Sequence, residues 1–104
     1  MTVTEKRVEL DGILRNILGS DHTYFQPPES IRMKYPAIVY SLDDVNNKSA
    51  DNITYKQERA YRLTVIDRDP DSEISVLVSR LPRCRYERHY VTDNLNHFVY
   101  IIYY

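Results

Sequence analysis

The chain has a single cysteine, no tryptophan, two glycines and no long apolar run. One cysteine, Cys84, excludes an internal disulfide framework, and we expect it to be a small strand residue facing a core in a reducing compartment. With Gly12 and Gly19 as the only glycines, the sequence has no glycine-rich phosphate-binding loop. The N-terminus lacks an apolar signal core, and nothing approaches the roughly 20 apolar residues of a membrane span. We therefore expect a soluble protein without a signal peptide.

Chain length and net charge limit the number of domains and the kinds of partner. The 104 residues suffice for one compact domain, residues 1–104, and are too few for two. The formal net charge of −1 argues against a dominant attraction to nucleic acid or membrane. Ten tyrosines stand against two phenylalanines. Tyrosine combines an apolar ring with a hydroxyl that stays hydrated, which suits interfaces, although β-strands favour it too.

Residues 96–104 read as a β-strand that is apolar or aromatic on both faces. One face would carry His97, Val99, Ile101 and Tyr103. The other would carry Phe98, Tyr100, Ile102 and Tyr104. A strand that covers one core normally alternates apolar with polar residues. This strand needs cover on both sides, and in so short a chain we expect the second cover to come from another subunit.

The N-terminal region predicts a helix over residues 3–18. Thr2 and Glu5 have the spacing of a capping box, and Gly19 stands where a left-handed C-cap is expected. Between these ends, apolar residues recur on one helical face at Leu10, Ile13, Leu14, Ile17 and Leu18.

Three strands are predicted next, over residues 23–25, 37–43 and 55–67. Pro27 and Pro28 end the first, because proline denies hydrogen-bond donors to a sheet. The polar stretch 43–54 predicts a loop of about 12 residues, which is long for a compact domain and typical of functional loops.

A second helix is predicted from Asp69 as N-cap and Pro70 as the first helical residue. Its apolar stripe would consist of Ile74, Leu77, Val78 and Leu81, before Pro82 ends it. Two strands over 84–91 and 96–104 follow, and a four-residue loop would pair Tyr90 with His97 and Tyr86 with Ile101. The predicted class is α+β, in the order α-β-β-β-α-β-β, with two helices and a mostly antiparallel sheet of four to five strands.

The acidic residues Asp67, Asp69, Asp71 and Glu73 occupy alternate positions, which allows two interpretations. A calcium-binding EF-hand loop that begins at Asp67 needs glycine sixth and glutamate twelfth, but Ser72 and Val78 stand there. An acidic helix N-terminus explains the cluster through capping and the helix dipole. A small metal-binding or metal-dependent domain remains the alternative from another class.

Other reactive residues form no recognisable catalytic or zinc-binding pattern, so we expect no enzyme, no cofactor and no metal. His22, His89 and His97 are scattered, and the expected hairpin register puts the last two on opposite faces. The sequence also has an arginine group, Arg80, Arg83, Arg85 and Arg88, interleaved with Tyr86 and Tyr90. Nucleic-acid contact is one interpretation, but Glu87 interrupts the group and the chain is not basic, which favours solvated charge or intersubunit ion pairs.

Several segments together resemble the small tail-completion proteins of long-tailed bacteriophages, the tail terminator or head–tail joining group. They are F-Q-P-P-E-S-I-R-M-K-Y-P-A-I-V-Y (25–40), A-D-N (50–52), Y-R-L-T-V-I-D-R-D-P-D-S (61–72) and D-N-L-N-H (93–97). The family has no catalytic motif. The resemblance therefore implies a structural protein of the virion that assembles in the host cytoplasm.

Such proteins form a ring, usually a hexamer, at the head-proximal end of the tail tube. The ring ends tube growth and presents the surface to which the connector of the filled head docks. DNA then passes through the lumen without specific binding. The implied partners are further copies of this chain, the tail tube protein and a connector or stopper protein. A head-completion or connector-stopper subunit is the alternative within the phage neck.

A cyclic ring needs two different matching patches on each subunit. For one patch we expect the outer face of the terminal strand, Phe98, Tyr100, Ile102 and Tyr104. For the other we expect the 55–67 strand or the first helix. Loops 25–35 and 43–54 are the candidates for axial contacts. In the second loop these contacts would involve Asp43, Asp44, Asn46, Asn47, Lys48, Asp51 and Asn52.

Overall fold

The computed structural model describes residues 2–50 and 53–104, with side chains placed for 2–46 and 58–104. Along the chain the elements are α1 (Val3–Leu18), β1 (Thr23–Phe25), β2 (Ala37–Ala50), β3 (Ile53–Asp67), α2 (Glu73–Ser79), β4 (Cys84–Thr92) and β5 (Leu95–Tyr103). This order confirms the predicted α+β class.

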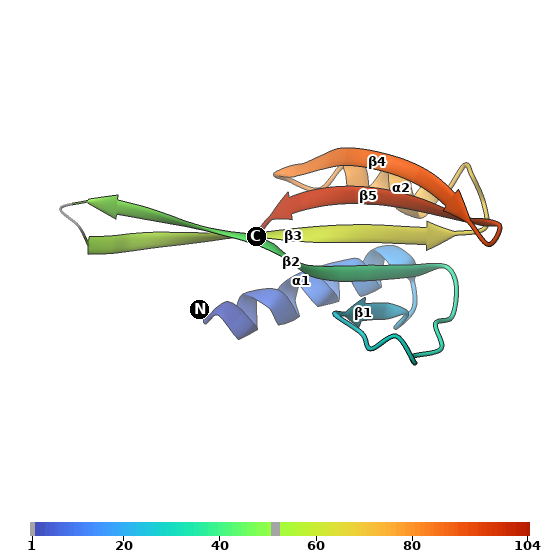
Figure 1. Cartoon of the computed structure of the whole chain (residues 1–104), viewed down its shortest axis with the longest axis horizontal. Coiled ribbons are helices and arrows are strands. Elements are labelled where there is room, and N and C mark those ends of the chain that lie inside the picture. Colours follow the sequence, from blue (N-terminus) through green and yellow to red (C-terminus); the bar gives the residue numbers. More distant parts are fainter. Residues whose placement is uncertain (1, 51–52) are drawn as a thin grey trace.

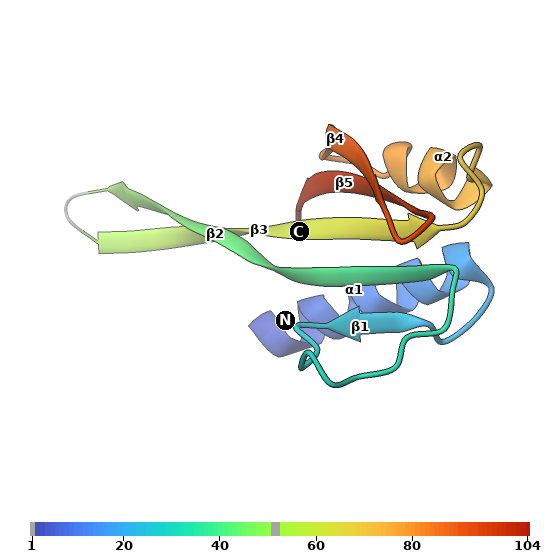
Figure 2. The same ribbon diagram turned by 45° about the vertical axis from the view of Figure 1, so that its right-hand side comes forward.

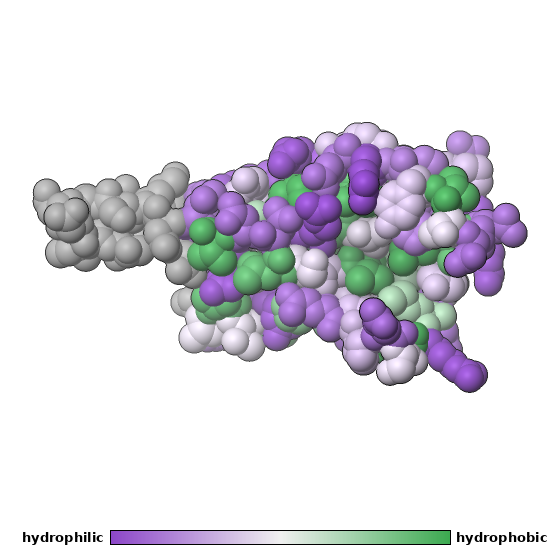
Figure 3. Space-filling view, viewed as in Figure 1, coloured by the Kyte–Doolittle hydropathy of each residue, from purple (hydrophilic) through white to green (hydrophobic). Residues whose placement is uncertain are grey.

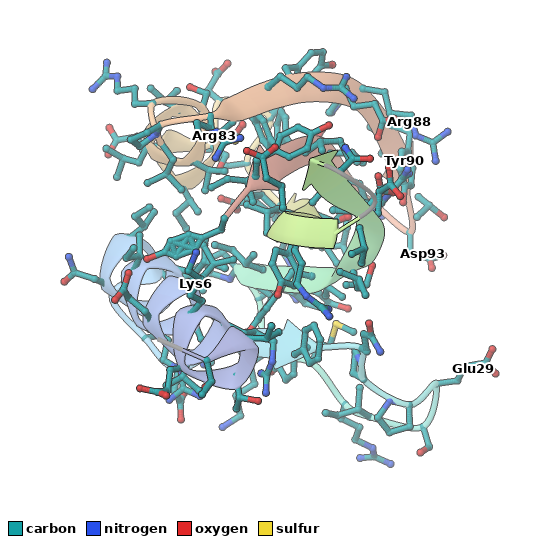
Figure 4. The ribbon with its side chains drawn as sticks, turned by 90° about the vertical axis from the view of Figure 1, so that its left-hand side faces the viewer. Lys6, Glu29, Arg83, Arg88, Tyr90 and Asp93 are labelled. Atoms are coloured by element: carbon teal, nitrogen blue, oxygen red, sulfur yellow. The ribbon has the colours of Figure 1, made fainter. Side chains whose placement is uncertain are left out.

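The five strands form one sheet in the order β1-β2-β3-β5-β4. Only the β1–β2 pair is parallel, and the other three pairs are antiparallel. Both helices lie on the same side of this sheet (Figures 1 and 2). Viewed along the molecule, the sheet curves strongly, with β4 arching over its upper edge (Figure 4).

Helix α1 begins and ends where the sequence predicts. The Thr2 side chain accepts a hydrogen bond from the Glu5 backbone N–H, and the Glu5 carboxylate accepts one from the Thr2 N–H. Gly19 adopts a φ of 71°, and its N–H donates to the carbonyl of Arg15. Glycine reaches this left-handed conformation without the strain that a Cβ atom brings.

The core lies between the two helices and the sheet. Leu10 and Leu14 of α1 and Val78 of α2 meet a layer of sheet side chains, all of them at most 3% exposed. The sheet contributes Ile38, Tyr40, Tyr61, Leu63, Val65, Tyr100 and Ile102. Burial of these apolar side chains between the helices and the sheet stabilises the fold.

The predicted loop over residues 43–54 is wrong, because β2 continues to Ala50 and β3 begins at Ile53. The two strands pair with each other as far as Ala50 and Ile53. They project from the body as a two-stranded ribbon (Figure 1), and the molecule measures 51 × 24 × 23 Å. The sequence of this stretch is mostly polar and lacks the apolar alternation by which a strand is recognised.

The start of α2 differs from the prediction. Its N-cap is Ser72, whose hydroxyl accepts from the Ser75 N–H at 3.2 Å, and not Asp69. The Asp69 carboxylate instead accepts from the Asp71 N–H at 2.9 Å in a turn that precedes the helix. The helix also ends earlier, at Ser79, so Pro82 lies beyond it.

The β4–β5 hairpin turns at Asp93 and Asn94, both with positive φ, as expected for a two-residue hairpin turn. Tyr90 pairs with His97 as predicted, but Tyr86 pairs with Tyr100 and not with Ile101. A register shift between Tyr86 and Arg88 is the cause. A bulge of this kind adds one residue to one strand and moves every later pair by one position.

Candidate functional site

The face of β5 predicted to contact another subunit is instead part of the core of the single chain. Tyr100 and Ile102 are each 3% exposed, and Phe98 and Tyr104 pack against the same cluster. The Tyr100 hydroxyl donates to the Ser75 carbonyl at 3.1 Å, and the Tyr104 hydroxyl donates to the Glu9 carboxylate. The two helices therefore cover most of this face, and Tyr100 and Ile102 are buried within the chain.

The opposite face of β5 is also covered from within the chain. Val99 and Ile101 are each 2% exposed. Arg62 and Arg85 are the register partners of Ile101 on either side, so their side chains lie on the same face. The aliphatic stems of arginines can cover apolar surface while their charged ends stay in water. The expectation of a doubly covered strand is met, but both covers come from the same chain.

Ion pairs hold this second cover in place. The Arg62 guanidinium lies 3.0 Å from the Asp43 carboxylate of β2 and 3.4 Å from the Glu87 carboxylate of β4. One arginine thus joins three strands across the face that lacks helices. Asp43, predicted to make an axial contact, is engaged inside its own subunit.

The ribbon formed by the outer parts of β2 and β3 extends beyond the strands that flank these two in the body. β1 pairs with β2 only at 38–40, and β5 pairs with β3 only at 60–67. Beyond those points each strand has the other as its sole sheet partner among the described residues. Of the predicted axial residues, Asp44 and Asn46 are exposed at the root of the ribbon. Asn47 and Lys48 continue β2, with side chains outside the described set, and Asp51 and Asn52 lie outside the described residues.

Strand β4 forms the opposite edge of the sheet, and its side chains are exposed from Arg85 to Thr92. Arg88 lies over the Tyr90 ring at 5.1 Å, and that ring stacks on His97 at 4.6 Å. Arg88 and Tyr90 lie on the side of the sheet away from both helices (Figure 4). Arg83, just before β4, pairs with Glu58 of β3 at 3.1 Å. The arginine group is thus partly used in ion pairs within the chain.

A polar cluster that the sequence did not reveal fastens α1 to the first two strands. Asp11 accepts hydrogen bonds from Tyr40 at 2.5 Å and Thr23 at 3.2 Å, and it pairs with Arg15 at 2.6 Å. Burial, and then the Asp11 carboxylate, raise the pKa of the Tyr40 hydroxyl far above its usual value. This cluster orients α1, and the i, i+4 spacing of Asp11 and Arg15 was its only sequence signal.

An apolar groove of about 360 Å³ lies where the end of β5 meets α1 and the segment after α2. Its walls come from Leu10, Ile13, Leu81, Pro82, Arg83, Ile102, Tyr103 and Tyr104. It has room for a few apolar side chains. Cys84, at the start of β4 nearby in sequence, is half-buried, and burial raises the pKa of its thiol to about 11. A thiol with that pKa is a poor nucleophile near neutral pH.

The acidic cluster before α2 uses its carboxylates in local turns. The Asp67 carboxylate accepts from the Asp69 N–H at 3.1 Å, the first of two successive turns of this kind. Among the described residues, no three His, Cys, Asp or Glu side chains are grouped so that they would hold a metal ion. The turns account for the alternate spacing of Asp67, Asp69 and Asp71 without a bound cation.

Large exposed hydrophobic residues are distributed over the body. They come from α1, the β1–β2 loop, β2, α2 and β4, and are Val3, Val8, Ile31, Leu42, Val76, Leu77, Tyr86, Tyr90 and Val91. Figure 3 shows hydrophobic surface broken up by hydrophilic side chains on one face of the body. Exposed hydrophobic side chains therefore do not single out one element as a docking surface. The unpaired edges of the strands are the remaining candidates.

No known family model matches this chain, and no curated protein sequence does so either. None of the helices in the described part of the chain is long and apolar enough to cross a membrane.

Proposed function

We propose that this chain is a structural protein of a long-tailed bacteriophage that forms a ring at the head-proximal end of the tail. The ring ends growth of the tail tube and offers the surface to which the head connector docks. The proposal starts from the resemblance over residues 25–40, 61–72 and 93–97. It places the protein in the virion, and in the host cytoplasm during assembly.

The observation that carries the proposal is the ribbon that stands off the body. Strand β5 is covered on both faces from within the chain, so it offers no face for a neighbouring subunit. The outer parts of β2 and β3, by contrast, have no strand partner besides each other among the described residues. Unpaired strand edges are avoided in proteins that act as monomers, because they pair with other chains. In a subunit that assembles, such edges can pair with strands of neighbouring copies.

A ring of this kind works by presenting surfaces, and it needs no reacting groups. Subunits related by rotation contact one another head to tail, so the ring closes and has two axial faces. Asp44 and Asn46 at the ribbon root are candidates for one axial face. The β1–β2 loop is a second candidate, because Glu29 points away from the body there (Figure 4). The tail tube and the connector would bind opposite faces, with DNA passing through the lumen. The resemblance implies six subunits.

A phage that lacks this chain tests the proposal. Electron micrographs of lysates should show DNA-filled heads, few joined virions, and tails that are overlong or irregular in length, because nothing caps the growing tube. Tails of normal length beside unjoined heads would contradict the terminator role and support the head-side stopper. Normal infectious particles would contradict both.

A further inference from the structure

The ribbon has two free edges of similar length. On β2 the outer edge has no strand partner beyond Tyr40, where pairing with β1 ends, and the Leu42 N–H donates to the Gln26 side chain at 3.1 Å. On β3 the edge has no strand partner before Ala60, where pairing with β5 begins. The last chain contact there is a hydrogen bond from the Tyr104 N–H to the Arg59 carbonyl. Along a free edge, every second residue points its N–H and C=O away from the ribbon.

Such a ribbon gains little stability on its own. Two paired strands without a third strand or a helix are marginal in water. Neither β2 nor β3 contains proline, which would block pairing at an edge. The ribbon therefore keeps its capacity to accept a further strand on each side.

We propose that ribbons of neighbouring copies pair edge to edge, the β2 edge of one chain against the β3 edge of the next. This inference rests on the proposed ring. Because β2 and β3 are antiparallel, the series β2-β3-β2-β3 stays antiparallel around the ring. Each copy supplies one edge of each kind, which is the head-to-tail contact that a cyclic ring requires.

Closure of the series would produce a β-barrel with two strands from each subunit and no edge left over. The barrel would surround the ring axis and form the wall of the lumen. Two register shifts in the β2–β3 pair fit this arrangement, one between Leu42 and Asp44 and one between Lys48 and Ser49. Bulges bend and twist strands, and they are frequent at the rims of barrels.

The edge of β4 is the competing partner for a ribbon, and it is less suited. Its register shift lies in mid-strand, between Tyr86 and Arg88, and Arg85, Glu87 and Arg88 follow one another closely. Bulges and charged side chains can protect an edge from further pairing, but the ribbon has both as well. The difference is that β4 offers one free edge, whereas the ribbon offers the two edges that a head-to-tail contact needs.

Cysteine cross-linking tests the pairing. In a C84A background we would make three single-cysteine proteins: N46C on β2, Q57C on β3 and V91C on β4. Neither N46C nor Q57C alone can join β2 to β3, so only their mixture reports the proposed contact. After assembly, a short bismaleimide should give several times more cross-linked dimer in the N46C and Q57C mixture than in either protein alone.

The other outcomes separate this inference from the proposed function. Rings in which N46C links to V91C, and not to Q57C, would overturn ribbon pairing in favour of the β4 edge. Rings that give neither product would also overturn it and leave the ring itself standing. A protein that forms no rings would contradict the proposed function and ribbon pairing together.

Discussion

Shortening the ribbon should separate assembly from folding. Residues 47–57 would be replaced by Asn-Gly, so that Asn46 and Glu58, which face each other in the register, are joined by a tight hairpin turn. None of the described core residues lies in the removed segment. An isolated ribbon contributes little net stability. Going from 11 residues to two is about two and a half halvings, and each halving changes closure entropy by only about 0.6 kcal/mol. The free energy of unfolding should therefore change by about 1.5 kcal/mol or less, which is within about 10 °C in melting temperature.

Two measurements on the shortened protein check this reasoning. Circular dichroism should give a melting curve close to that of the full chain, and native mass spectrometry should show monomers in place of rings. The matched control replaces only residues 51–52 with Asn-Gly, which introduces the same two residues and keeps the chain length. That control should still assemble. A shortened protein that is unfolded would show that the ribbon supports the body, and one that still forms rings would show that the ribbon is not the contact.

Three further perturbations test the packing. Ile102→Ala should lower the free energy of unfolding by about 2–5 kcal/mol because Ile102 is buried in the core. Ile102→Asp should prevent folding, and a thermal melt that shows a folded Ile102→Asp monomer would contradict the core placement. Ser72→Ala should cost about 1 kcal/mol through loss of the α2 cap, more than Asp69→Ala in the same urea titration, and millimolar calcium should leave the melting temperature unchanged. Burial raises the pKa of Cys84 from 9.0 to about 11, so iodoacetamide should react slowly at pH 8 and faster as the pH rises toward 11. The folded thiol holds its proton more tightly than the unfolded one, so its stabilising contribution is complete below pH 9 and falls between pH 9 and 11; fast alkylation of the native protein at pH 8 would show that Cys84 is accessible.

The parts of the fold that were predictable have local signals. The capping box at Thr2 and Glu5 and the C-cap at Gly19 delimit α1, because each depends on residues close in sequence. The pairing of Tyr90 with His97 followed from the turn beside it. The helix-facing residues of β5 were identified as needing cover, since an apolar pattern on two faces requires it.

The parts that were mispredicted depend on tertiary context. Asp69-Pro70 and Ser72 both fit a helix start, and only the path of the chain after β3 decides between them. The β4 bulge has no sequence signature. Arg62 looks like a surface charge in the sequence, and its role over Ile101 appears only when β2, β4 and β5 are brought together.

The ribbon is the element whose misprediction matters most for function. Residues 43–54 are mostly polar, and polarity without alternation is typical of loops. The candidate interface moves accordingly, from the side chains of β5 to the backbone edges of β2 and β3.

Negative-stain electron microscopy of the purified protein tests the central claim most directly. The account predicts rings of uniform diameter with a central hole, and loss of those rings in the ribbon-shortened protein while the tip control keeps them. Monomers alone, at every protein and salt concentration at which the chain remains folded, would contradict it.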